Sequence, residues 1–223
     1  MARVITCRST PTPELRAEMA VLVGRGGLLA VPTESSYALA VSPFSTAAVD
    51  RLIRVKGRPD HKPILVLIGR PDHLLRLTAC VPPAAERLIA RCWPGPLTMV
   101  LPAQASLPLA LTAGTGTIGV RLPAHPGLRA LLAILGPLTG TSANRAGAPP
   151  LMTAEAVAQA FPEEVDAVVD LGPAGGGAPS TVVSFSGRDV YVLRQGPVTR
   201  EHLAEALAAT GSRVLDTGDA TGL

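Results

Sequence analysis

Two short apolar runs limit the fold of this chain more than any other feature of its sequence. Residues 27–31 (GLLAV) are stopped by Pro32, and residues 64–68 (ILVLI) lie between Pro63 and Gly69. Neither run alternates with polar residues, so each is expected to be a strand that is covered on both faces. Only 3% of the residues are aromatic although 47% are hydrophobic, so the core must consist of Ala, Val, Leu and Ile. Such a core favours a layered α/β protein.

The remaining patterns predict that strands and helices alternate along the chain. Further strands are expected at 3–7, 97–101, 117–122, 138–141, 167–171, 180–184 and 190–194. Helices are expected at 12–24, 45–56, 71–77, 83–92, 126–135, 153–161 and 199–209, and a loop at 102–116. We predict a twisted, mixed sheet, parallel in part, with flanking helices. Residues 1–209 are expected to form one domain, and residues 210–223 a flexible tail.

Polar side chains follow the first apolar run, where a structural turn usually carries Gly or Asn. Thr33, Glu34, Ser35 and Ser36 come directly after the proline that ends the strand. This pattern is typical of the edge of a binding site. Glu34 is the only carboxylate of this stretch, and two roles stay open for it, orienting Lys56 or moving a proton.

Three cations lie within seven residues at the end of the helix predicted over 45–56. They are Lys56, Arg58 and Lys62, and Pro59 and Pro63 bracket the third. Cations at a helix C-terminus suit the helix dipole, so a solvated helix end is one reading. The prolines stiffen the segment and hold like charges together, which favours the second reading, a site for a polyanion.

Two later strands also end in polar residues. Gly119 and Arg121 share one face of the strand predicted over 117–122, which suggests a ligand close to that face. An exposed arginine on an edge strand is an equally good reading from the sequence alone. Ser142 and Asn144 follow the strand predicted over 138–141, and both are also ordinary turn residues.

Charge and cysteine content narrow the class of protein. The net charge is only +3, but five cations face one acidic residue between positions 51 and 62, so a local basic surface suits a nucleotide or RNA. Cys7, Cys80 and Cys92 show no C-x-x-C spacing, which predicts neither a disulfide framework nor a zinc site. With no apolar stretch long enough for a bilayer and no signal-peptide pattern, we expect a cytoplasmic protein without membrane contact.

Six ordered blocks resemble the YrdC/TsaC-type threonylcarbamoyl-AMP synthases over about residues 14 to 200. They are PTE at 32–34 with Tyr37 and the KGRP and KP of 56–63, WPGPLT at 93–98, GVRLP at 119–123, TSAN at 141–144, GGGAPSTVV at 175–183, and LRQG at 193–196. The resemblance implies the YrdC-like fold with a basic concave groove.

The resemblance also implies a reaction and a set of binding residues. L-threonine, bicarbonate or CO2, and ATP with Mg2+ would give threonylcarbamoyl-AMP and pyrophosphate. A separate transferase would then use the product to modify the tRNA adenosine beside the anticodon. The implied ATP-binding residues are Lys56, Arg58, Lys62, Thr117, Ser142, Asn144 and Arg194. The implied threonine-binding residues are Thr33, Ser35, Arg121, Thr141 and Ser180, with Arg121 on the carboxylate. No residue is assigned as a general acid or base or as a metal ligand.

Some positions depart from the family pattern. Ala38 replaces the usual Gly after the Tyr, Leu67 stands where a His is often found, and Ser35-Ser36 replaces Thr-Ala or Thr-Val. These changes are expected near the amino-acid pocket. Two alternatives therefore stay open. One is a paralogue that makes a carbamoyl-adenylate from another amine or from carbamoyl phosphate, and the other is a noncatalytic RNA-binding module that uses the basic face.

Overall fold

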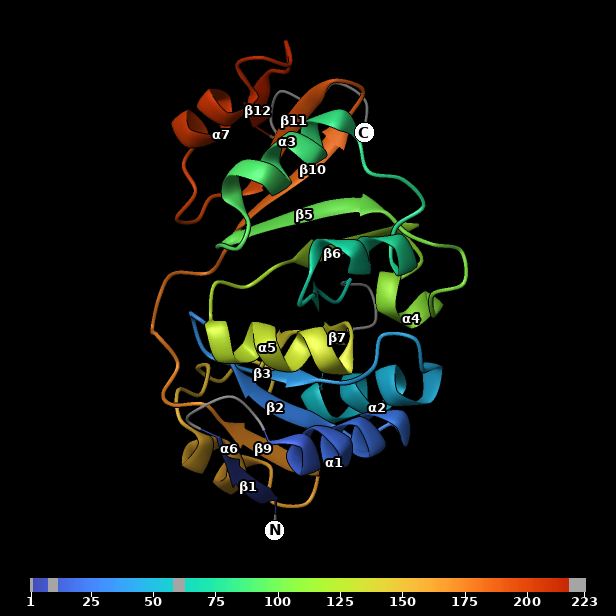
Figure 1. Ribbon diagram of the computed structural model, residues 1–223, viewed down its shortest axis with the longest axis vertical. Helices are drawn as coiled ribbons and strands as arrows, with labels where there is room; N and C mark the ends of the chain where they lie inside the picture. The colour runs from blue at the N-terminus through green and yellow to red at the C-terminus, as the bar shows by residue number, and fades with distance from the viewer. Residues whose placement is uncertain (1, 8–11, 58–62, 217–223) are drawn as a thin grey trace.

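The computed structural model of the protein describes residues 2–7, 12–57 and 63–216. Within these ranges the strands form two mixed sheets that follow each other along the long axis, with helices at their flanks (Figure 1). The first sheet has the order β1 (Arg3–Thr6), β9 (Ala167–Asp170), β2 (Leu29–Pro32), β3 (Tyr37–Ala40), β8 (Thr141–Ser142). The second has the order β12 (Val214–Asp216), β11 (Asp189–Arg194), β10 (Thr181–Ser186), β5 (Leu97–Pro102), β6 (Thr117–Arg121), β4 (Val66–Leu67), β7 (Leu138–Thr139). The mixed α/β fold is confirmed, but the single predicted sheet is two sheets.

Four helices, α1 (Pro13–Gly24), α2 (Thr46–Lys56), α6 (Ala154–Ala160) and α7 (Arg200–Leu207), begin at the side-chain caps that the sequence predicted. The others are α3 (Pro83–Cys92), α4 (Leu109–Thr112) and α5 (Pro126–Leu135), with a 3-10 helix η1 (Pro71–Arg76). Thr12, Ser45, Thr153 and Thr199 each accept a hydrogen bond from a main-chain N–H of the first turn that follows. Gly57 ends α2 in the left-handed conformation, so Lys56 is the last residue of that helix. No helix in the described ranges is both long and apolar enough to cross a membrane.

Strand β3 is absent from the elements predicted by the sequence. It pairs antiparallel with β2, and Pro32 faces Tyr37 in the register, so residues 33–36 form the turn of a hairpin. Residues 37–41 (YALAV) are as apolar as residues 27–31 and are fully or almost fully buried. The polar residues after Pro32 therefore lie on a rigid turn between two buried strands.

Gly140 divides the strand predicted over 138–141 between the two sheets. β7 pairs with β4 in the second sheet, whereas β8 pairs with β3 in the first. The main-chain N–H of Gly140 donates a 2.7 Å hydrogen bond to Leu65. A Cβ atom at position 140 would lie 2.7 Å from Cγ of Leu67, so the junction needs glycine for close approach.

Gly140→Ala is expected to lower the free energy of unfolding by about 1–3 kcal/mol, because the added methyl overpacks the junction. Urea denaturation measures the change. Gly24→Ala is the control, since a Cβ there meets nothing within 4 Å. Adding Leu67→Ala removes the atoms that the methyl would meet. The loss of unfolding free energy in the double variant should therefore be smaller than the sum of the losses in the two single variants. Losses that add strictly would contradict this account.

Two other regions differ from the expected elements. The segment expected as a loop over 102–116 contains α4, which forms because Leu107 and Leu111 are buried in the main apolar cluster. Within the expected C-terminal tail, β12 pairs in parallel with β11, and Arg213 bonds Asp189 at 2.5 Å. The extent of the single domain, residues 1–209, stays a prediction.

Candidate functional site

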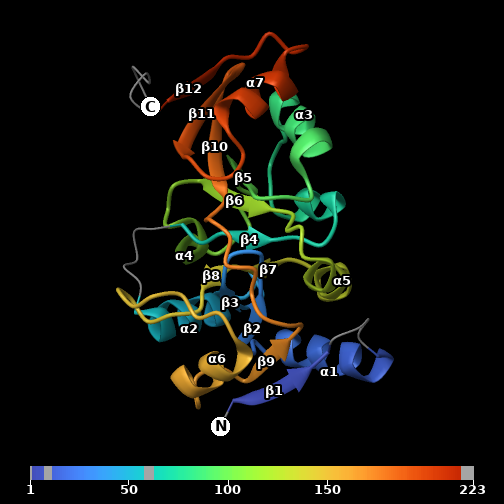
Figure 2. The same cartoon turned by 90° about the vertical axis from the view of Figure 1, so that its left-hand side faces the viewer.

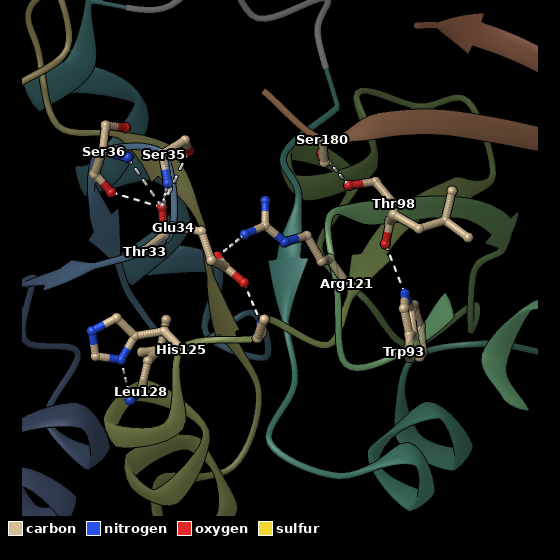
Figure 3. Close-up of polar contacts among 12 residues, drawn as sticks. Thr33, Glu34, Ser35, Ser36, Trp93, Thr98, Arg121, His125, Leu128 and Ser180 are labelled. Carbon is tan, nitrogen blue, oxygen red and sulfur yellow. Dashed lines mark hydrogen bonds and ion pairs between the residues drawn. The ribbon is translucent and has the colours of Figure 1, made fainter. Parts of the chain in front are cut away.

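The turn between β2 and β3 is held by its own threonine (Figure 3). Thr33 donates from Oγ1 to the main-chain oxygen of Ser36 at 2.7 Å, and the same Oγ1 accepts from the N–H groups of Ser35 and Ser36 at 3.2 and 3.3 Å. The Thr33 and Ser35 hydroxyl oxygens lie 3.3 Å apart. Because Thr33 is buried and fully engaged, the turn presents the side chain of Glu34 in one direction.

Glu34 pairs with Arg121 of β6 and so joins the first sheet to the second (Figure 3). One carboxylate oxygen accepts from Nη2 of Arg121, and the other accepts from the main-chain N–H of Ala124. The Arg121 side chain is only 6% exposed. Burial lowers the pKa of Arg121, and Glu34 opposes this shift. The reading of Arg121 as an exposed edge-strand residue is wrong, because β6 lies between β5 and β4. Glu34 is paired with Arg121, not placed to orient Lys56.

Lys56 lies against β8 and the turn that follows it. Its ammonium donates to the main-chain oxygens of Ser142 and Asn144 at 2.6 and 2.8 Å and to the Ser142 hydroxyl at 3.2 Å. It also donates to the side-chain oxygen of Asn144, which accepts from the Ser142 hydroxyl at 2.7 Å. Lys56 is buried, so these oxygens fix its position. The structure thus brings together three predicted ATP-binding residues, whereas Arg58 and Lys62 lie outside the described residues.

Arg194 of β11 lies against Ser180, just before β10. Its Nε and Nη2 donate to the main-chain oxygen of Ser180 at 3.1 and 2.8 Å, and Nη2 reaches the hydroxyl at 3.2 Å. That hydroxyl is 2.8 Å from the hydroxyl of Thr98 on β5 (Figure 3). The positive charge of Arg194 is a further cause that lowers the pKa of Arg121. Sequence reasoning assigned no role to Thr98, although it ends the block WPGPLT.

Thr117 and Thr141 lie at the margins of these clusters. Thr117 starts β6, and its hydroxyl lies 2.9 Å from that of Thr115. Arg121 lies four residue steps further along the strand, about 13 Å away on the same face. Thr141 is buried on β8, where it pairs with Leu39. The binding roles of all the described site residues stay predictions.

The glycine-rich connection between β9 and β10 passes over the β2–β3 turn. Figure 2 shows this segment running from the first sheet to the second. The N–H groups of Gly175 and Gly177 donate to the main-chain oxygens of Thr33 and Glu34 at 3.4 and 3.0 Å. A Cβ at Gly175 would lie 2.7 Å from the Glu34 oxygen, so glycine is required for this approach. The segment is a packed part of the site and more than a linker.

Two departures from the family pattern are packing positions. Ala38 and Leu67 are 3% and 1% exposed, and both belong to an apolar cluster with residues of α1 and α5. Leu67 also covers Gly140. Both side chains lie in the core, but Leu67 is also the register partner of Arg121, so the expectation that these changes lie near the amino-acid pocket stays a prediction. Ser35, the third, does lie on the site turn.

The sequence of this chain is similar to those of known proteins. The model of the Sua5/YciO/YrdC family, described as "Telomere recombination", matches residues 22–196. The threonylcarbamoyl-AMP synthase of Bacillus subtilis is 37% identical over 197 residues, which cover 87% of this chain and 57% of that protein. The putative threonylcarbamoyl-AMP synthase of Mycobacterium tuberculosis is 36% identical over 182 residues, covering 82% of this chain and 84% of that protein.

A solved structure has the same fold. P. abyssi Sua5 complexed with L-threonine superimposes with a TM-score of 0.85 at 32% sequence identity. The match covers 95% of this chain and 62% of Sua5. The chain therefore spans less than two thirds of the Bacillus and Pyrococcus proteins that it matches.

Proposed function

The chain belongs to the Sua5/YciO/YrdC family, and we propose that it is a nucleotidyltransferase, a threonylcarbamoyl-AMP synthase. Its substrates would be L-threonine, bicarbonate or CO2, and ATP, and its products threonylcarbamoyl-AMP and pyrophosphate. One observation carries the proposal. Two buried cations lie beside the β2–β3 hairpin: Lys56, the last residue of α2, bonds the end of β8, which pairs with β3, and Arg121 of β6 pairs with Glu34 in the turn. Such a pair suits a ligand that joins a phosphate to a carboxylate.

The proposed chemistry needs positioning and charge more than proton transfer. Carbamate forms from the free amine and CO2, one of its oxygens attacks the α-phosphorus of ATP, and pyrophosphate leaves. Lys56 and Arg194 would offset the charge that develops on the phosphates, while Arg121 holds the amino-acid carboxylate.

Mg2+ would enter with the triphosphate. The described residues include no group of three or more His, Cys, Asp or Glu side chains that could hold a metal ion. Mg2+ that is bound to a triphosphate is held mainly by phosphate oxygens and water. Mg2+ would neutralise part of the charge on the leaving pyrophosphate.

The product is a reactive mixed anhydride of a carbamic and a phosphoric acid. It must be consumed by an acyl-group transfer, and we propose that a separate transferase uses it to modify tRNA adenosine. A cytoplasmic location is part of the same proposal, and RNA is a further candidate partner.

The proposal is tested by pyrophosphate release from ATP and bicarbonate, with and without L-threonine and then with the other amino acids. We expect release that depends on L-threonine. Release with another amine alone would favour the paralogue. No release with any amine, together with RNA affinity that weakens steeply as salt is raised, would favour the binding module. Leu67 pairs with Arg121 in the sheet, so the departure at position 67 keeps the paralogue as an alternative.

A further inference from the structure

Glu34 connects segments that lie far apart in the sequence. Its carboxylate accepts from Arg121 and from the N–H of Ala124 (Figure 3). Its main-chain oxygen accepts a 3.0 Å hydrogen bond from the N–H of Gly177. The same residue therefore holds the β2–β3 turn against β6 and against the glycine-rich connection.

The ion pair with Glu34 does not engage every N–H donor of the Arg121 side chain. Among the described residues, the buried Nε of Arg121 has no hydrogen-bond partner. Buried N–H groups are nearly always bonded, and this one belongs to a side chain that is 6% exposed. An acceptor that arrives with a ligand would complete the arrangement.

We propose that Glu34 is a positioning residue that holds Nη2 of Arg121 and thereby directs the free Nε–H toward the carboxylate of the amino-acid substrate. This inference rests on the proposed function, in which Arg121 binds that carboxylate. A guanidinium carries its donors in one fixed plane, so anchoring one N–H sets the direction of the others. Glu34 acts only through Arg121 and takes no part in bond making.

The negative charge of Glu34 is part of this role. Burial and the nearby Arg194 both lower the pKa of Arg121, and Glu34 is the group that opposes them. An amide at position 34 keeps a hydrogen-bond acceptor but loses this compensation. Glu34→Gln should therefore weaken amino-acid binding. Glu34→Asp keeps the negative charge on a shorter side chain, so it should retain part of the amino-acid affinity.

The test compares Glu34→Gln, Glu34→Asp and Glu34→Ala in the full 223-residue chain. Glu18→Gln is the matched control, because Glu18 pairs with Arg3 at the surface of α1, away from the site. Pyrophosphate release gives KM for L-threonine and for ATP, and calorimetry gives L-threonine affinity without turnover. We expect Glu34→Gln to raise the KM for L-threonine roughly tenfold or more, with little change for ATP. Glu18→Gln should match the unmodified protein.

Chemical rescue gives a second readout that a purely structural role would not produce. The Glu34 side chain is 26% exposed, so acetate or formate can enter the space that Glu34→Ala leaves. Added carboxylate should then restore part of the lost L-threonine affinity in Glu34→Ala and leave the affinity of Glu18→Gln, which has lost none, unchanged. If Glu34→Ala does not fold, Glu34→Gln and Glu34→Asp decide the question by themselves.

The outcomes separate this inference from the proposed function. Unchanged L-threonine binding in Glu34→Gln would overturn the positioning role, and so would equal losses of affinity for L-threonine and ATP. The unmodified protein is measured first. If it binds no L-threonine, the proposed function fails, and the role of Glu34 that rests on it fails with it.

Discussion

Lys56→Ala is expected to lower the affinity for ATP by about 100-fold or more, because the proposed nucleotide site loses a buried positive charge that offsets the phosphates. The residue is buried and held by oxygens of Ser142 and Asn144, so its charge has a fixed position. Calorimetric titration with ATP measures the change. Because those main-chain oxygens lose their donor, the free energy of unfolding should also fall by about 1–3 kcal/mol.

Arg54→Ala is the matched control for this experiment. Arg54 lies in the last turn of the same helix but is exposed. Arg54→Ala should leave the ATP affinity within about twofold of that of the unmodified protein, because exposed charges contribute little to binding. Lys56→Arg keeps the charge and tests position alone. Equal ATP affinities for Lys56→Ala and Arg54→Ala would remove Lys56 from the nucleotide site.

Arg121→Ala is expected to reduce L-threonine affinity by about 100-fold or more while ATP affinity changes much less. The carboxylate of the substrate would lose its buried cation, whereas Lys56 and its partners stay in place. Calorimetry with each ligand separately measures the two effects. Arg213→Ala is the control, since Arg213 forms an exposed ion pair in the second sheet and its side chain is 71% exposed. Equal losses for both ligands would contradict the assignment of Arg121 to the amino acid.

The ion pair also predicts an asymmetry in stability. Removing Glu34 leaves Arg121 buried and unpaired, which should cost about 3–5 kcal/mol of the free energy of unfolding. Removing Arg121 leaves a carboxylate that is 26% exposed and keeps the hydrogen bond from Ala124, so Arg121→Ala should cost less. Urea denaturation of Glu34→Ala, Arg121→Ala and the double variant tests this. A double variant less stable than Glu34→Ala alone would show that the pair is not the source of the loss.

Local signals in the sequence predicted most of the helices and many of the strands. The helix at 13–24 follows from Thr12 and Pro13, and the end of α2 at Lys56 follows from Gly57, because capping acts within one turn of the chain. The hairpin of β10 and β11 follows from two apolar segments around Gly187 in the same way. The six sequence blocks that contain the candidate binding residues could also be recognised from the sequence, since each is a short run of residues.

Only the tertiary structure decided how these pieces meet. Glu34 and Arg121 are 87 residues apart and Thr98 and Ser180 are 82 apart, and no periodicity encodes such partners. The break at Gly140, which sends β7 and β8 to different sheets, depends in the same way on Leu67 packing from another strand. The sequence by itself determined which residues could bind a charged ligand and where helices begin, because those properties are local. Which cation faces which carboxylate depends on the pairing of strands that are distant in the sequence. These partners are fixed only when the two sheets pack against each other.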